Sequence, residues 1–122
     1  MKKMPVIDIF AGPGGLGEGF TRAGFDVRLS IEMDAIASET LKIRKFYYQF
    51  NKDSVPNEYY DFLEGKIAKE ELKKQFPKEW EESEKAILTA ELGKEDQELI
   101  NEKIKDALGE DNDFILIGGP PC

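Results

Sequence analysis

Histidine is absent from this chain of 122 residues, and cysteine occurs once, at Cys122. A single cysteine excludes an internal disulfide framework. Without histidine the chain also lacks the usual set of zinc ligands, so we expect no metal site. Hydrophobic residues make up 40% and charged residues 34% of the chain, which is ordinary for one modest folded domain.

Long apolar runs are also missing. No stretch reaches the roughly 20 apolar residues that a membrane-spanning helix requires, so we expect no membrane partner. The start of the chain is basic at Lys2 and Lys3, but its short apolar run leads directly into a glycine-rich segment. This pattern is typical of a first β-strand rather than of a signal peptide.

Basic residues are too few to balance the acidic ones, and the net charge is −8. Residues 1–50 are nearly neutral, so the excess of Asp and Glu lies in residues 51–122. An acidic surface repels a phosphate backbone, and groups that contact nucleic acid must therefore lie elsewhere or in a small local patch. The only dense basic cluster is Lys42, Arg44 and Lys45, a pattern that more often marks a solvated helix face.

The segment 6–20 has the pattern of a strand, a tight turn and the start of a helix. Val6, Ile7 and Ile9 suit a buried strand, and the glycines that follow lack the Cβ atoms that would keep a ligand from the backbone. The free amide groups of the next helix favour a carboxylate or phosphate. Read literally, the loop also contains the dinucleotide-binding pattern G-x-G-x-x-G at Gly12, Gly14 and Gly17.

A second strand is predicted over residues 26–31, followed by Glu32, Met33 and a helix that Asp34 caps. In α/β nucleotide sites, an acidic residue at the end of the second strand binds the ribose, because a carboxylate accepts from both hydroxyl groups of a diol. Glu32 is the candidate for this contact. Met33 beside it offers a soft apolar surface to an adenine ring.

The segment at about 51–111 differs from the rest because it is rich in Lys and Glu and broken by prolines and glycines. Its apolar residues form four clusters at helical spacing, one of which includes Trp80, Ile87 and Leu88. We interpret the whole segment as a helical insertion with a packing role. It contains no motif of catalytic type.

The chain closes with a fully apolar strand at 114–117, which we expect to be buried, followed by the sequence Gly-Gly-Pro-Pro-Cys. Proline fixes φ and stiffens this loop, which suits the positioning of a nucleophile. Ligands of open α/β sheets bind at the carboxyl ends of the strands. Cys122 is therefore expected near the glycine loop of residues 12–15.

Taken in order, Asp8, Phe10 and the following glycines give D-x-F-x-G-x-G-G, and Pro121-Cys122 follows the later strand. These motifs resemble those of the cytosine-C5 DNA methyltransferases. The resemblance implies a Rossmann-like α/β fold, S-adenosylmethionine as cofactor, DNA as substrate and Cys122 as the catalytic nucleophile. It also implies a cofactor site built from ten residues: Phe10, Ala11, Gly12, Pro13, Gly14, Gly15, Leu16, Glu32, Met33 and Pro121.

The chemistry of that family explains the thiol. C5 of cytosine is a weak nucleophile, and addition of a thiolate to C6 makes C5 reactive enough to accept a methyl group. The target base must leave the duplex to be reached. A prokaryotic restriction-modification enzyme of this type is expected in the cytoplasm.

Two departures from the family are evident. The family's third motif, an acidic residue before an apolar one, has no clear match, and Asp106 and Asp111 are weak candidates. The sequence also ends at the nucleophile, so we expect residues 1–122 to be the N-terminal part of the catalytic domain. The fold would then be incomplete, and the chain alone inactive and prone to self-association or to pairing with a complementing C-terminal portion.

Other functions stay open at this point. They are a non-catalytic S-adenosylmethionine-binding module, an RNA cytosine-C5 methyltransferase and a dinucleotide-dependent oxidoreductase. The last of these would bind NAD through the same glycine loop.

Overall fold

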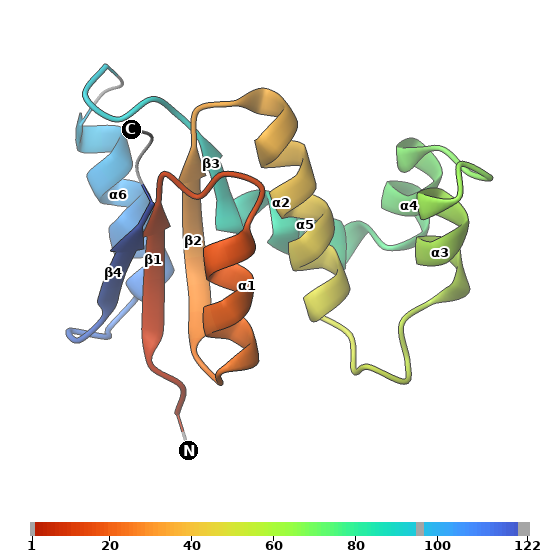
Figure 1. Ribbon diagram of the computed structural model, residues 1–122, viewed down its shortest axis with the longest axis horizontal. Helices are drawn as coiled ribbons and strands as arrows, with labels where there is room; N and C mark the ends of the chain where they lie inside the picture. Colours follow the sequence, from red (N-terminus) through yellow and green to blue (C-terminus); the bar gives the residue numbers. More distant parts are fainter. Residues whose placement is uncertain (1, 95–96, 120–122) are drawn as a thin grey trace.

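A parallel four-stranded sheet forms the centre of the computed structural model, which describes residues 2–94 and 97–119 (Figure 1). The strands lie in the order β3-β2-β1-β4, and every neighbouring pair is parallel. Their bounds are Pro5–Ile9 for β1, Asp26–Glu32 for β2, Ile87–Thr89 for β3 and Ile115–Gly118 for β4. All four carboxyl ends therefore lie along one edge of the sheet.

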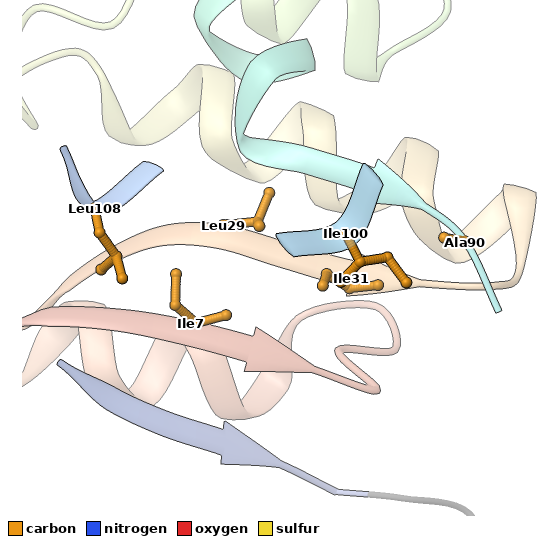
Figure 2. Close-up of a cluster of buried hydrophobic side chains, with 6 residues drawn as sticks. All are labelled: Ile7, Leu29, Ile31, Ala90, Ile100 and Leu108. Atoms are coloured by element: carbon orange, nitrogen blue, oxygen red, sulfur yellow. The ribbon is translucent and has the colours of Figure 1, made fainter. Parts of the chain in front are cut away.

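Helices cover both faces of the sheet, as a parallel sheet requires. Helices α1 (Gly15–Arg22) and α2 (Ala35–Tyr48) lie on one face, and α6 (Gln97–Leu108) lies on the other (Figure 1). Figure 2 shows the core beneath α6, in which Ile7, Leu29 and Ile31 from two strands pack with side chains of α6. Alternate residues of β1 point the other way, so Asp8 faces the side of α1.

Local sequence sets where the first two helices begin and end. Gly24, at φ 96°, follows the end of α1 and adopts the left-handed conformation that other residues avoid. Asp34 caps α2, because its Oδ2 accepts a hydrogen bond of 2.9 Å from the amide of Ala37. The start of α2 agrees with the cap predicted from the sequence at Asp34.

Helices α3 (Asn57–Leu63), α4 (Lys69–Gln75) and α5 (Pro77–Ala86) follow α2. They pack with the second half of α2 around an aromatic cluster that includes Phe46, Tyr59 and Trp80. In Figure 1, α3 and α4 lie to one side of the sheet, beyond α2. These helices form a small second core next to the sheet.

Two expectations from the sequence were wrong in this region. Ile87 and Leu88, assigned to a helix, are in strand β3, which continues directly from α5. The strand beginning near Phe114 was expected to be fully buried, but Leu116 is 58% exposed because β4 is at the edge of the described sheet.

Within the described residues, no helix is long and apolar enough to cross a membrane. The same residues contain no group of three or more side chains suited to binding a metal ion.

Candidate functional site

A pocket of about 440 Å³ opens at the carboxyl ends of the strands. It lies where the loop after β1, the end of β2 and the segment after β3 meet, and Gly119, which follows β4, completes its wall. The other lining residues are Phe10, Gly12, Ile31, Glu32, Met33, Ala90, Glu91 and Leu92.

The backbone of the glycine loop turns sharply at three positions. Phe10 has φ 54°, an uncommon conformation for a bulky residue, and Gly12 and Gly14 have φ 59° and 103°. The amide of Ala11 donates a hydrogen bond of 3.0 Å to the carbonyl of Ile31, which holds the start of the loop against β2. The strained turn leaves the ring of Phe10 38% exposed at the pocket wall.

Glu32 ties this loop to the start of α2. Its Oε1 accepts a hydrogen bond of 3.0 Å from the amide of Gly12, and its Oε2 accepts one of 2.7 Å from the amide of Asp34. Each carboxylate oxygen has a second lone pair, so both can still accept from a ligand. The carboxylate is thus fixed in place at the pocket wall and has free acceptor capacity.

Glu91 is a pocket residue that the sequence analysis missed. It follows β3, and the pair Glu91-Leu92 has the acidic-then-apolar pattern of the family's third motif. The signal was present in the sequence, but the strand that precedes it was assigned to a helix. The two weak candidates lie elsewhere: Asp111 pairs with Lys2 and Arg28, and Asp106 lines a different cavity.

The other residues of the predicted loop have different environments. Ala11 is buried with Leu41, Ala86 and Ile87 in a cluster under α2. Gly14 packs closely against α2, since a Cβ atom there would lie 2.9 Å from Leu41 Cδ2. Pro13, Gly15 and Leu16 are in the loop and the first turn of α1, and Leu16 is 46% exposed.

Pro121 and Cys122 lie outside the described residues, so the structure does not place them. Gly119, the last residue described, lines the pocket. Cys122 is only three residues further along the chain.

Asp8 is a buried carboxyl group close to the loop. It is 1% exposed, and neither of its oxygens has a hydrogen-bond partner among the described residues. Burial raises the pKa of Asp8 to about 6. Its Oδ2 faces α1 so closely that a Cβ atom at Gly17 would lie 3.1 Å away.

The chemistry of the pocket favours one kind of ligand. Phe10, Met33 and Leu92 offer apolar surface for a planar ring, while Glu32 and Glu91 offer acceptors for hydroxyl and amino groups. Among the described residues that line the pocket are two carboxylates and no cationic side chain. A neutral or cationic nucleoside therefore fits this pocket better than a ligand whose phosphates would face the two carboxylates.

The parallel sheet, the glycine loop after β1 and the carboxylate at the end of β2 define a doubly wound α/β protein of the Rossmann-like class. Within that class, the chain belongs to the C-5 cytosine-specific DNA methylase family, whose model matches residues 4–70. That match covers just over half of the chain.

Individual relatives agree with the family. Type II methyltransferase M.Bpa9945I of Bacillus paralicheniformis is 28% identical over 137 aligned residues, covering 98% of this chain and 31% of the relative. Putative type II methyltransferase M.OihORF3336P of Oceanobacillus iheyensis is 32% identical over 122 residues, covering 99% of this chain and 19% of the relative. Type II methyltransferase M.DdeI of Desulfomicrobium norvegicum is 44% identical over 52 residues, covering 43% of this chain and 11% of the relative.

The chain therefore spans a third or less of the length of these curated relatives. No solved structure matches it significantly.

Proposed function

We propose that this chain is the cofactor-binding and nucleophile-bearing portion of a DNA (cytosine-5-)-methyltransferase of a restriction-modification system. The observation that carries the proposal is the placement of Glu32, which two backbone amides hold at the end of β2 beside an open pocket. A carboxylate in this position accepts hydrogen bonds from a ribose diol.

Residues of the pocket then have separate roles toward S-adenosylmethionine. Glu32 binds the ribose hydroxyl groups, and Glu91 accepts a hydrogen bond from the amino group of the adenine. Phe10, Met33 and Leu92 contact the adenine ring with their apolar surfaces. The cofactor, when bound, supplies an activated methyl group on a sulfonium centre, and the two carboxylates suit its positive charge.

Cys122 is the proposed nucleophile. β4 leads the chain to the pocket at Gly119. Cys122 is three residues further along the chain, a separation short enough for its thiol to reach the pocket region. Its thiolate adds to C6 of the target cytosine, which makes C5 able to accept the methyl group. Loss of the C5 proton then allows elimination of the cysteine and restores the aromatic ring. Pro121 stiffens the approach to the thiol.

Activity on DNA belongs to the whole protein in this proposal. The relatives named as methyltransferases are at least three times as long as the stretch that matches this chain. We therefore expect the 122-residue chain to bind cofactor weakly and to transfer no methyl group by itself.

Isothermal titration calorimetry tests the proposal directly. We expect the chain to bind S-adenosylhomocysteine and to show no binding of NAD at the same concentrations. Glu32→Ala should weaken S-adenosylhomocysteine binding about tenfold or more, because it removes the ribose acceptor. Glu64→Ala, which removes an exposed carboxylate at the end of α3 and outside the pocket, is the matched control.

Two results would contradict the proposal. Tighter binding of NAD than of S-adenosylhomocysteine would identify a dinucleotide site, and equal affinities for Glu32→Ala and Glu64→Ala would refute the ribose contact. A radiolabelled methyl-transfer assay with the full-length protein then decides between an enzyme and a binding module. In that assay Cys122→Ser should abolish transfer while leaving S-adenosylhomocysteine binding intact.

A further inference from the structure

A second concave surface of about 660 Å³ lies between the later turns of α1 and α2 and the start of α3. We call it the α1–α2 cleft. Its lining includes the cations Arg22, Arg44 and Lys52, a single carboxylate, Glu18, and four aromatic rings, of which Tyr48 is the most exposed. Arg22 is the last residue of α1, whereas the glycine loop precedes the first residue of that helix. This cleft and the cofactor pocket therefore lie toward opposite ends of the strands.

The cleft is a local exception in an acidic chain. Three cationic side chains face one carboxylate here, although the whole chain carries a net charge of −8. Arg22 and Lys52 are exposed to solvent at the surface. An anionic ligand is therefore attracted to this site while most of the remaining surface repels it.

The basic cluster seen in the sequence contributes only one residue to the cleft. Lys42 pairs with Glu39 at 3.2 Å, and the Nζ of Lys45 donates to the carbonyl of Val27 at 3.0 Å. Arg44 alone turns toward the cleft. Lys52 follows α2 closely in the chain, and folding brings Arg22 of α1 to the same place, so the positive patch depends on how α1 packs against α2.

Glu18 organises the cleft rather than opposing an anion. Arg44 donates a hydrogen bond to Glu18 Oε2, while Tyr48 and Arg22 donate to Oε1 at 2.7 and 3.3 Å. These contacts occupy both carboxylate oxygens and hold the hydroxyl end of Tyr48 in place. The guanidinium of Arg22 has five N–H donors and interacts here with Glu18 and with the hydroxyl of Tyr48, so other donors remain available to a ligand.

A fixed aromatic ring beside exposed cations is the combination that binds single-stranded nucleic acid. Each base has a flat face that stacks on tyrosine, and each phosphate binds lysine or arginine. Tyr48 is 37% exposed and makes an edge contact with Tyr47, with ring centroids 5.2 Å apart. The ring thus has supporting structure behind it and a surface open to solvent.

We propose that the α1–α2 cleft binds a single-stranded segment of nucleic acid, with phosphates on Arg22 and Lys52 and one base on Tyr48. This site is separate from the cofactor pocket and does not depend on the function proposed for that pocket. Because the cleft lies toward the other end of the strands, it binds a part of the nucleic acid that does not include the reacting base.

Fluorescence anisotropy of the chain with a labelled single-stranded DNA of about 12 nucleotides tests the site, since grooves of this kind cover about 4–16 nucleotides. We expect binding at about 50 mM KCl that weakens steeply toward about 200 mM. The double variant Arg22→Glu with Lys52→Glu should bind at least tenfold more weakly. The slope of log Kd against log salt concentration should be smaller by about 1.4, which is about 0.7 for each lost phosphate contact.

The matched control is the double variant Lys66→Glu with Lys85→Glu, which changes the net charge equally at exposed positions outside the cleft. It should bind within about threefold of the parent chain if the site is local. Tyr48→Leu should weaken binding at least fivefold by removing the stacking surface. Tyr48→Phe keeps the ring and loses the interactions of the hydroxyl with Glu18 and Arg22, so it should retain most of the affinity.

Several outcomes would overturn the proposal. These are no binding at low salt, an equal loss in the control double variant, or an unchanged affinity of Tyr48→Leu. Equal competition by polyphosphate at matched charge would show a general anion site instead, and equal affinity for duplex DNA would exclude base stacking. Calorimetry with S-adenosylhomocysteine on the same variants should show unchanged affinity, which separates a failure here from a failure of the cofactor proposal.

Discussion

The carboxylate of Glu32 accepts a hydrogen bond from the backbone amide of Gly12, across 20 residues of sequence, at 3.0 Å. The side chain proposed to bind the cofactor ribose therefore also holds the glycine loop. Its second oxygen holds the amide of Asp34 at the start of α2. Cofactor binding and loop position are thus coupled through one carboxylate.

Glu32→Gln separates the contact with the Gly12 amide from the contact with the Asp34 amide. One oxygen can still accept from the Gly12 amide, but the new NH₂ group then faces the Asp34 amide, and two donors cannot bond to each other. We expect the free energy of unfolding to fall by about 1.5–3 kcal/mol, the size of a lost hydrogen bond to a charged group. Urea denaturation of the chain measures this, and a stability equal to that of the parent chain would show that the Asp34 contact contributes nothing.

Asp8 should make the protein less stable as the pH rises. Its pKa is about 6 in the folded chain, raised by burial, and about 3.9 in an unfolded chain. Between these values the folded state keeps a proton that the unfolded state has lost, so the free energy of unfolding falls through this window. Above pH 6 the ionisation of Asp8 lowers the free energy of unfolding by about 3 kcal/mol in total.

Asp8→Asn removes this ionisation. We expect it to raise the free energy of unfolding by about 1–3 kcal/mol at pH 8 relative to the parent chain, with little difference near pH 4. Urea denaturation at pH 4, 6 and 8 tests the pattern, and Asp53→Asn in an exposed loop controls for the lost charge. A difference that is the same at all three pH values would assign the effect to packing.

Two neighbouring glycines should respond very differently to alanine. At Gly14, where φ is 103°, a Cβ atom would lie 2.9 Å from Leu41 Cδ2, whereas at Gly15 nothing lies within 4 Å. Gly14→Ala is expected to lower stability by about 2 kcal/mol or more, through backbone strain and the clash. Gly15→Ala, at the start of α1, should leave stability unchanged or slightly increased. Thermal unfolding of both variants tests this, and equal losses would refute it.

The edge of β4 that no described strand covers should promote self-association. Leu116 in β4 is 58% exposed, Phe114 just before it is 43% exposed, and the strand carries no charged residue. We expect the light-scattering mass to rise with concentration, and Leu116→Lys to suppress that rise. Leu63→Lys alters a leucine of similar exposure on α3 and should not suppress the rise in mass. A monomer at all concentrations would contradict the expectation.

The sequence predicted the first half of the fold well because its signals are local. The apolar strand before the glycine loop, the helix that Asp34 caps and the position of Glu32 all depend on residues a few positions apart. Such patterns follow from the periods of helix and strand and from capping. The family assignment from the glycine motif is confirmed by the match of residues 4–70.

The second half was less predictable for physical reasons. β3 has only three residues, Ile87–Thr89, and follows α5 with no glycine or proline between them, so no local signal separates helix from strand. Missing this strand also hid Glu91. Arg22 of the α1–α2 cleft belongs to α1, and only the tertiary packing of α1 on α2 brings it to Arg44 and Lys52.

The sheet order also dictates when the protein can fold during synthesis. β1 lies between β2, which follows it closely, and β4, where Val6 pairs with the distant Ile115. A nascent chain can form the β1–β2 pair early, but the other edge of β1 stays unpaired until Ile115 and the rest of β4 have left the ribosome. An exposed apolar edge for that whole interval is a site for aggregation. Slow translation of the acidic helical segment would lengthen this vulnerable period, and the yield of native protein would depend on it.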